Sequence, residues 1–113
     1  MRFAGALAVV AMATAAVTPA APAHADVDTD FANQLHTYGI YGPRDYNAWL
    51  AKITCRRLDE GLDSNAEKSA AFLSPNLPHG ATTEQTWQFL AAAISTYCPD
   101  RTAVLASVAE TNR

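Results

Sequence analysis

Two cysteines, Cys55 and Cys98, limit the folds open to this chain more than any other feature of its sequence. A redox couple usually has the spacing Cys-x-x-Cys, whereas 42 residues lie between these two. A zinc site takes four ligands, and the three histidines are scattered rather than grouped with the cysteines. If the chain is exported, one structural disulfide is the simplest use of the pair, and two free thiols are the alternative.

The first 25 residues indicate that the chain is exported. They contain one positive charge at Arg2, an apolar run over 4–17, two prolines, and Ala-His-Ala at 23–25. This is the pattern of a secretory signal peptide, so we expect residues 1–25 to be removed by cleavage after Ala25. A retained membrane anchor is the alternative, but the run is shorter than the roughly 20 apolar residues of a spanning helix. The expected location is therefore extracytoplasmic, either secreted or associated with the cell envelope.

The expected mature chain, residues 26–113, is long enough for one domain with a modest core. Removal of Arg2 with the leader leaves seven basic and eleven acidic residues, a net charge of −4. This balance argues against a nucleic-acid partner and against a polybasic membrane-surface protein. We expect no transmembrane segment in the mature chain and a monomer.

The mature chain has the periodicity of amphipathic helices separated by glycine and proline, and it contains no strand pattern. The prediction is an all-α fold, a small bundle of four to five helices with its core in residues 28–99 and a short helical tail over 100–113. The expected helices are 28–38, 43–61, 64–74, 83–98 and 101–113.

Local signals predict where these helices begin and end. Asp28 is the expected N-cap of the first helix and Gly39 its C′ residue. Pro43 suits the first position of the second helix. Ser64 and Glu67 have the spacing of a capping box for the third helix.

Apolar residues fall on both sides of the second helix, which predicts that it is sandwiched between others. One side carries Tyr46, Trp49, Leu50 and Ile53, and the other Ala48, Ala51, Cys55, Leu58 and Leu62. The fourth helix has a single apolar face made of Trp87, Leu90, Ala91, Ile94 and Cys98. A Cys55–Cys98 bridge would therefore pin the second and fourth helices together in the core, and closing a loop of this length is worth about 4 kcal/mol.

No set of catalytic groups is recognisable in the sequence. His36 and His79 have no nucleophile at a suitable spacing, and no Gly-x-Ser-x-Gly is present. Lys52, Arg56 and Arg57 form a small basic group that adjacent acidic residues compensate. We therefore expect no enzymatic activity, no metal and no cofactor.

The candidate ligand-binding residues are Tyr41, Tyr38 and His79. Tyr41 stands in the 39–43 turn, outside any apolar stripe, where it either covers the glycine backbone or lines a groove. Tyrosine and histidine are residue types that ligate or stack on haem. A carrier of a hydrophobic or planar ligand such as haem is therefore the alternative function.

Four segments together resemble a family of small exported mycobacterial proteins, the domain of unknown function 732. They are Asp28 with Phe31, the Gly39–Ile40 turn, "ITCRRLDEGL" over 53–62, and "FLAAAISTYCPD" over 89–100. The most specific element is Ala-x-x-x-Tyr-Cys-Pro, residues 93–99. The chain departs from the commoner family pattern at "WLAKITC", which stands where the family has a Gly-His-x-Val-Cys-like sequence.

The resemblance implies an all-helical, disulfide-bonded, secreted or envelope-associated protein, and it implies no activity. The functional hypothesis is a non-enzymatic binding or interaction module for an unknown protein or envelope partner. A cavity between the second and fourth helices would favour the carrier, and a filled core with an exposed groove would favour the interaction module.

Overall fold

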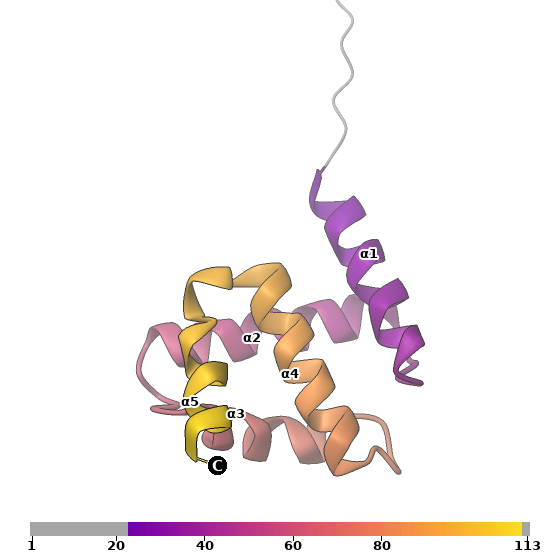
Figure 1. Ribbon diagram of the computed structural model, residues 1–113. Coiled ribbons are helices and arrows are strands. Elements are labelled where there is room, and N and C mark those ends of the chain that lie inside the picture. Colours follow the sequence, from indigo (N-terminus) through magenta and orange to yellow (C-terminus); the bar gives the residue numbers. More distant parts are fainter. Residues whose placement is uncertain (1–22, 112–113) are drawn as a thin grey trace, which may run out of the picture.

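The protein is all-helical in residues 23–111, the part that this computed structural model describes (Figure 1). Five α-helices and two short 3₁₀ helices make up these residues, with no strand among them. The α-helices are α1 (Ala23–Thr37), α2 (Arg44–Asp59), α3 (Ala66–Leu73), α4 (Thr83–Tyr97) and α5 (Ala103–Thr111). The 3₁₀ helices are η3 (Ser74–Asn76) and η4 (Pro99–Arg101). The predicted small helical bundle is confirmed, while most of the expected signal peptide lies outside the described residues.

The core lies where α1, α2 and α4 meet, and α3 closes it from below in the view of Figure 1. Phe31 of α1 is at its centre, with edge-to-face contacts to Phe89, at 5.5 Å between ring centroids, and to Tyr97, at 5.2 Å. Aromatic pairs favour this geometry. α5 packs against α3, and its Val104, Leu105 and Val108 are partly buried against the core.

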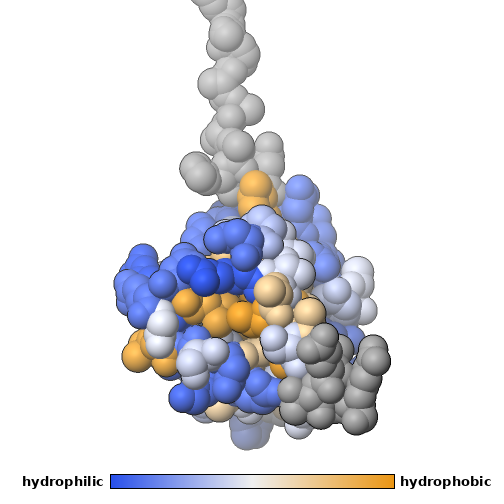
Figure 2. Space-filling view, turned by 60° about the vertical axis from the view of Figure 1, so that its left-hand side comes forward, coloured by the Kyte–Doolittle hydropathy of each residue, from blue (hydrophilic) through white to orange (hydrophobic). Residues whose placement is uncertain are grey.

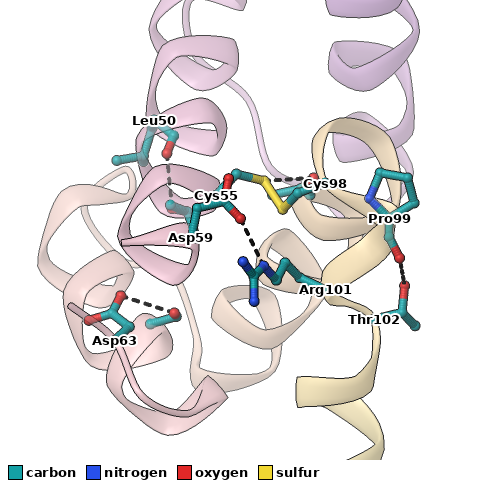
Figure 3. Close-up of a disulfide and its surroundings, with 11 residues drawn as sticks. Leu50, Cys55, Asp59, Asp63, Cys98, Pro99, Arg101 and Thr102 are labelled. Atoms are coloured by element: carbon teal, nitrogen blue, oxygen red, sulfur yellow. Dashed lines mark hydrogen bonds and ion pairs between the residues drawn. A yellow bond between two sulfur atoms is a disulfide. The ribbon is translucent and has the colours of Figure 1, made fainter. Parts of the chain in front are cut away.

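The Cys55–Cys98 disulfide joins α2 to the end of α4, as predicted (Figure 3). Cys55 and Cys98 are both buried, and their Cα atoms lie 5.9 Å apart. Cys98 is also the C-cap of α4, and its N–H donates to the Ile94 carbonyl at 2.9 Å. The bridge therefore fixes the end of α4 to the C-terminal half of α2.

Asp28 and Pro43 do not have the roles expected at the two helix starts. α1 begins at Ala23, so Asp28 lies inside the helix and its carboxylate contacts side chains of α2 and α4 instead. Pro43 was predicted as the first residue of α2 but is its N-cap, with ψ 131°, and the helix begins one residue later at Arg44. The end of α1 is as predicted. Gly39 has φ 80°, and the N–H of Ile40 donates to the Leu35 carbonyl at 3.0 Å, a Schellman motif.

The prediction of a Ser64–Glu67 capping box for α3 is wrong, because the N-cap lies one residue later. Asn65 is the N-cap of α3, and its side chain accepts from the Lys68 N–H at 2.9 Å. The start of α3 is set by Asp63, which is buried and accepts two hydrogen bonds from Arg57 and one from Ser69. This network draws the chain inward at Asp63, so that Asn65 stands at the position of the N-cap. For α4, Thr82 is the N-cap and forms a capping box with Gln85.

The two apolar sides of α2 are each buried only in part. Ala48, Ala51, Cys55 and Leu58 of one side face the core, and so does Leu50 of the other. Trp49 is 55% exposed, and Leu62, which follows the end of the helix, is 60% exposed. Small Ala48 and Ala51 allow neighbouring helices to approach closely, whereas no helix within residues 23–111 covers Trp49. The prediction that Trp49 and Tyr46 are core residues is therefore wrong. Their rings contact each other at the surface, with centroids 5.8 Å apart.

The buried face of α4 is wider than the predicted stripe and is centred on different residues. Leu90, Ile94 and Cys98 are buried as expected, but Trp87 is only partly buried. The wider face includes Phe89, Ala92 and Ala93, because α4 is packed by α1, α2 and α3 at once.

The molecular surface is mixed in character. The face of the molecule shown in Figure 2 carries a small apolar area that is bordered by hydrophilic side chains.

Candidate binding cleft

A cleft opens between the turn that joins α1 to α2 and the connection from η3 to α4. Both segments lie at the lower right of Figure 1. The cleft has a volume of about 590 Å³, within the usual range for small-molecule sites. Its lining comes from 39–43, from the first turn of α2 (Tyr46 and Asn47), from 76–81, and from Gln85.

One wall of the cleft is held in place by Gln85. Its Oε1 accepts from the Thr82 N–H at 2.9 Å, and its Nε2 donates to the Tyr38 carbonyl at 3.1 Å. The start of α4 is thereby fixed to the end of α1. Gly39 permits this approach, because a Cβ at this position would lie 3.3 Å from Gln85 Nε2.

The opposite wall is the 76–81 connection, which is anchored from both ends. Leu77 is buried, and its N–H donates to the Leu73 carbonyl at 3.1 Å. The Tyr46 hydroxyl donates to the Asn76 carbonyl at 2.8 Å and so joins α2 to this wall. The cleft is therefore a product of tertiary contacts between segments 30 or more residues apart.

Two of the three predicted ligand residues line this cleft together. Tyr41 is 60% exposed, and its ring contacts that of His36 at 5.0 Å between centroids. His79 lies on the opposite wall. Tyr38 is outside the lining. Its ring is partly buried against the core, and its hydroxyl accepts from Gln34 Nε2 at 3.1 Å.

Asn47 is the cleft residue that the sequence reasoning missed. It is 3% exposed, and its side-chain oxygen Oδ1 is buried with no hydrogen-bond partner in the described residues. Most buried polar atoms in proteins are paired, so an unpaired one needs an explanation. The signal was present in the sequence, because an asparagine with Leu50, Ala51 and Thr54 three, four and seven positions later lies on the buried side of the helix.

A second hollow, of about 720 Å³, lies between α1, α2 and the end of α4 and contains a polar cluster. The Tyr97 hydroxyl donates to Asp28 Oδ1 at 2.6 Å, and Lys52 Nζ lies 3.4 Å from Asp28 Oδ2. Burial alone would raise the pKa of Asp28, but the hydrogen bonds from Tyr97 and Lys52 outweigh it and lower the pKa below 3.8. Burial, followed by the bond to Asp28, raises the pKa of Tyr97. Each group has a partner within the cluster, so we interpret it as structural.

The basic group on α2 is largely compensated by ion pairs. Lys52 pairs with Asp28, and Arg57 pairs with Asp63 at 2.9 Å. Within residues 23–111, no three His, Cys, Asp or Glu side chains come together as a metal site would require. None of the helices described there combines the length and apolar character needed to cross a bilayer.

The fold and the cleft define a small, all-helical, disulfide-bonded protein with an open surface cleft. The chain belongs to the family described as "Protein of unknown function (DUF732)", which it matches over residues 27–100. It is 59% identical over 98 residues to "Uncharacterized protein Rv0559c" of Mycobacterium tuberculosis (strain H37Rv) and, to the same extent, to "Uncharacterized protein MT0585" of strain CDC 1551. Each alignment covers 86% of this chain and 88% of the relative. No solved structure matches the chain.

Proposed function

We propose that this chain is an exported, non-enzymatic binding module that acts outside the cytoplasm and holds its partner in the cleft between 39–43 and 76–81. The observation that carries this proposal is the exposed aromatic lining of that cleft, Tyr41 and Tyr46, beside the buried and unpaired Oδ1 of Asn47. Polar atoms without partners and uncovered aromatic rings are features of binding surfaces. The signal-peptide pattern of residues 1–25 supports the proposed location.

The filled core favours a surface binder over a protein that encloses its ligand. The interface of α2 and α4 is packed with Ala51, Leu90 and Ile94 and is closed by the disulfide. The cleft lies instead at the outer end of α2, with both walls open to solvent. A partner therefore has access to it without any separation of the helices.

The chemistry of the lining supports a role without catalysis. Within the described residues, the groups lining the cleft include no serine, threonine, cysteine or carboxylate side chain. His79 therefore has no nucleophile to activate there, and no acid-base pair faces the cleft. Binding is the activity that this set of side chains supports.

The test is a capture experiment with matched variants. The secreted protein is immobilised, exposed to mycobacterial envelope extract and culture filtrate, and the retained molecules are quantified by mass spectrometry. With Tyr41→Ala, the amount of at least one retained species is expected to fall at least about tenfold, because an aromatic anchor of the binding surface is removed. Leu62→Ala is the control, because Leu62 is also 60% exposed but lies at the far end of α2. Equal retention by both variants would contradict the proposal.

A carrier of a planar ligand such as haem is the second candidate, because Tyr41 and His79 line the same cleft. Against it, no lysine or arginine among the described residues lines the cleft to pair with the propionates. We therefore expect a haem titration to give no saturable change of the Soret band. A stoichiometric change that Tyr41→Phe or His79→Ala abolishes would establish the carrier instead.

A further inference from the structure

The cleft is uncharged. None of its described lining residues is Asp, Glu, Lys or Arg, although such residues occur throughout the rest of the surface. Charged ligands are normally held by a side chain of opposite charge or by several aligned N–H groups. A nucleotide, an acidic sugar or a lipid phosphate would leave its charge uncompensated here. The lining thus selects for a neutral ligand.

The cleft is also too polar for a purely apolar ligand. The Tyr41 hydroxyl and the His79 ring line the cleft, are exposed to water and have no hydrogen-bond partner in the described part of the chain. Covering such groups with hydrocarbon removes their water and gives nothing in return, which costs free energy for each group. The ligand must therefore offer hydrogen-bonding groups together with an apolar surface.

Asn47 offers its amide nitrogen to the cleft. Its Nδ2 atom faces the turn, because a Cβ at Gly42 would lie 3.7 Å from it. Gly42 and Asn47 both line the cleft, whereas Asn47 Oδ1 is buried. A ligand hydroxyl oxygen at this point would accept a hydrogen bond from Asn47 Nδ2.

We propose that the cleft binds a neutral saccharide, with one sugar ring packed against Tyr41 and a hydroxyl bonded to the Asn47 amide. A pyranose ring carries an apolar C–H face that packs on an aromatic ring, and hydroxyl groups that both donate and accept. These are the two requirements of an uncharged aromatic cleft with unpaired amide, imidazole and phenol groups. The inference rests on the proposed function, since it names the ligand class of the same site.

The experiment is a titration of the ¹⁵N-labelled secreted protein, followed by ¹H–¹⁵N spectra. The probes are maltotriose, mannotriose and galactobiose, with galacturonate trimer and decaproline for comparison. At least one neutral saccharide is expected to shift the amides of 39–47 and 76–81 saturably, with a Kd on the order of 1 mM for so small a ligand. The galacturonate trimer is expected to bind at least about tenfold more weakly, because no cation faces it.

Two variants separate recognition from folding. Tyr41→Ala and Asn47→Leu are each expected to weaken saccharide binding at least about tenfold while the remaining amide shifts stay native. Leu62→Ala is expected to bind as the wild type does. If Tyr41→Phe retains saccharide binding and Tyr41→Ala loses it, the contact is made by the aromatic ring of Tyr41.

The outcomes also distinguish this inference from the proposed function. If decaproline shifts the same amides and no saccharide does, the proposal of a saccharide ligand is overturned, while the proposed function as a binding module stands. Saccharide shifts that map away from the cleft, or that both cleft variants retain, would overturn it as well. Absence of any binding, together with equal capture by Tyr41→Ala and Leu62→Ala, would overturn both proposals.

Discussion

The stability of the fold does not explain why an asparagine stands at position 47. An unpaired buried acceptor costs about 1–3 kcal/mol, and this one could be replaced by leucine, a side chain of similar shape. Proteins tolerate such costs where the group acts on a ligand, so that stability and function oppose each other. Asn47 is therefore the position where a substitution should separate the two properties.

Asn47→Leu is expected to leave the free energy of unfolding unchanged or to raise it by about 1 kcal/mol, because the unpaired acceptor is removed. Urea unfolding followed by circular dichroism measures the change. Thr54→Val is the control, since Thr54 is equally buried but its hydroxyl donates to the Leu50 carbonyl at 2.9 Å. A loss of more than about 2 kcal/mol in Asn47→Leu would show that its oxygen is paired in solution.

Tyr97 and Asp28 should make stability depend on pH at both extremes. The lowered pKa of Asp28 contributes stability above its unfolded value of 3.8, and this is lost as pH falls through the folded pKa. The raised pKa of Tyr97 contributes stability below its unfolded value of 10, and this is lost as pH rises.

Tyr97→Phe is therefore expected to cost about 1–2 kcal/mol at neutral pH and less at an acid pH below the folded pKa of Asp28, where that carboxyl is protonated. Urea unfolding at the two pH values gives the comparison. Tyr38→Phe serves as the control, because among the described residues its hydroxyl bonds the exposed Gln34 alone. A cost independent of pH would exclude the link to the Asp28 carboxylate.

The helices themselves were predictable because their signals are local. The periodicity of 83–98, Thr82 before it and Gly39 after α1 are all read within one or two turns of the chain. The orientation of α2 was not predictable, because it depends on packing against other helices, α1 and α4. Trp49 is apolar enough for a core, yet none of the described elements lies over it.

The candidate site was predictable only in part, for the same reason. Tyr41 and His79 were identifiable as residue types in turns, but their common cleft depends on Gln85 bonding to the Tyr38 carbonyl. Nothing in the sequence joins these distant segments. The α2–α3 junction shows a similar limit, since both Ser64 and Asn65 are good caps and the buried Asp63 determines which is used.

Asp63→Ala is expected to destabilise the protein by about 3 kcal/mol, since it leaves Arg57 and Ser69 without their buried partner. Asp59→Ala is the matched control. Asp59 pairs with Arg101 at 2.8 Å (Figure 3). Both side chains are exposed, so the loss of this pair should cost less than about 1 kcal/mol. Equal costs in thermal or urea unfolding would refute the structural role of the Asp63 network.

The whole molecule is a small bundle whose two central helices are joined covalently. Replacing Cys55 and Cys98 together with serine is expected to lower the free energy of unfolding by about 2–5 kcal/mol, because the bridge closes a long loop in a small domain. Thiol titration of the denatured, unreduced protein should find no free cysteine. Two reactive thiols would contradict the pinned architecture.

Export is proposed for the chain as a whole and has its own test. The intact mass of the protein recovered from culture filtrate or envelope is expected to correspond to a chain that begins at Asp26, since the leader pattern places cleavage after Ala25. Tryptic peptides of the same sample identify the N-terminal residue. A mass that includes residues 1–25 would contradict the proposed processing and location.

Site-specific photocrosslinking tests the central claim, that the cleft is the binding site, most directly. The photoreactive p-benzoylphenylalanine is placed at Tyr41 in one sample and at Leu62 in another, two positions that are each 60% exposed. After irradiation with mycobacterial envelope extract, the Tyr41 sample should form a defined adduct that excess unlabelled protein competes away. The Leu62 sample should form none. Adducts at both positions, or at Leu62 alone, would contradict the assignment of binding to the cleft.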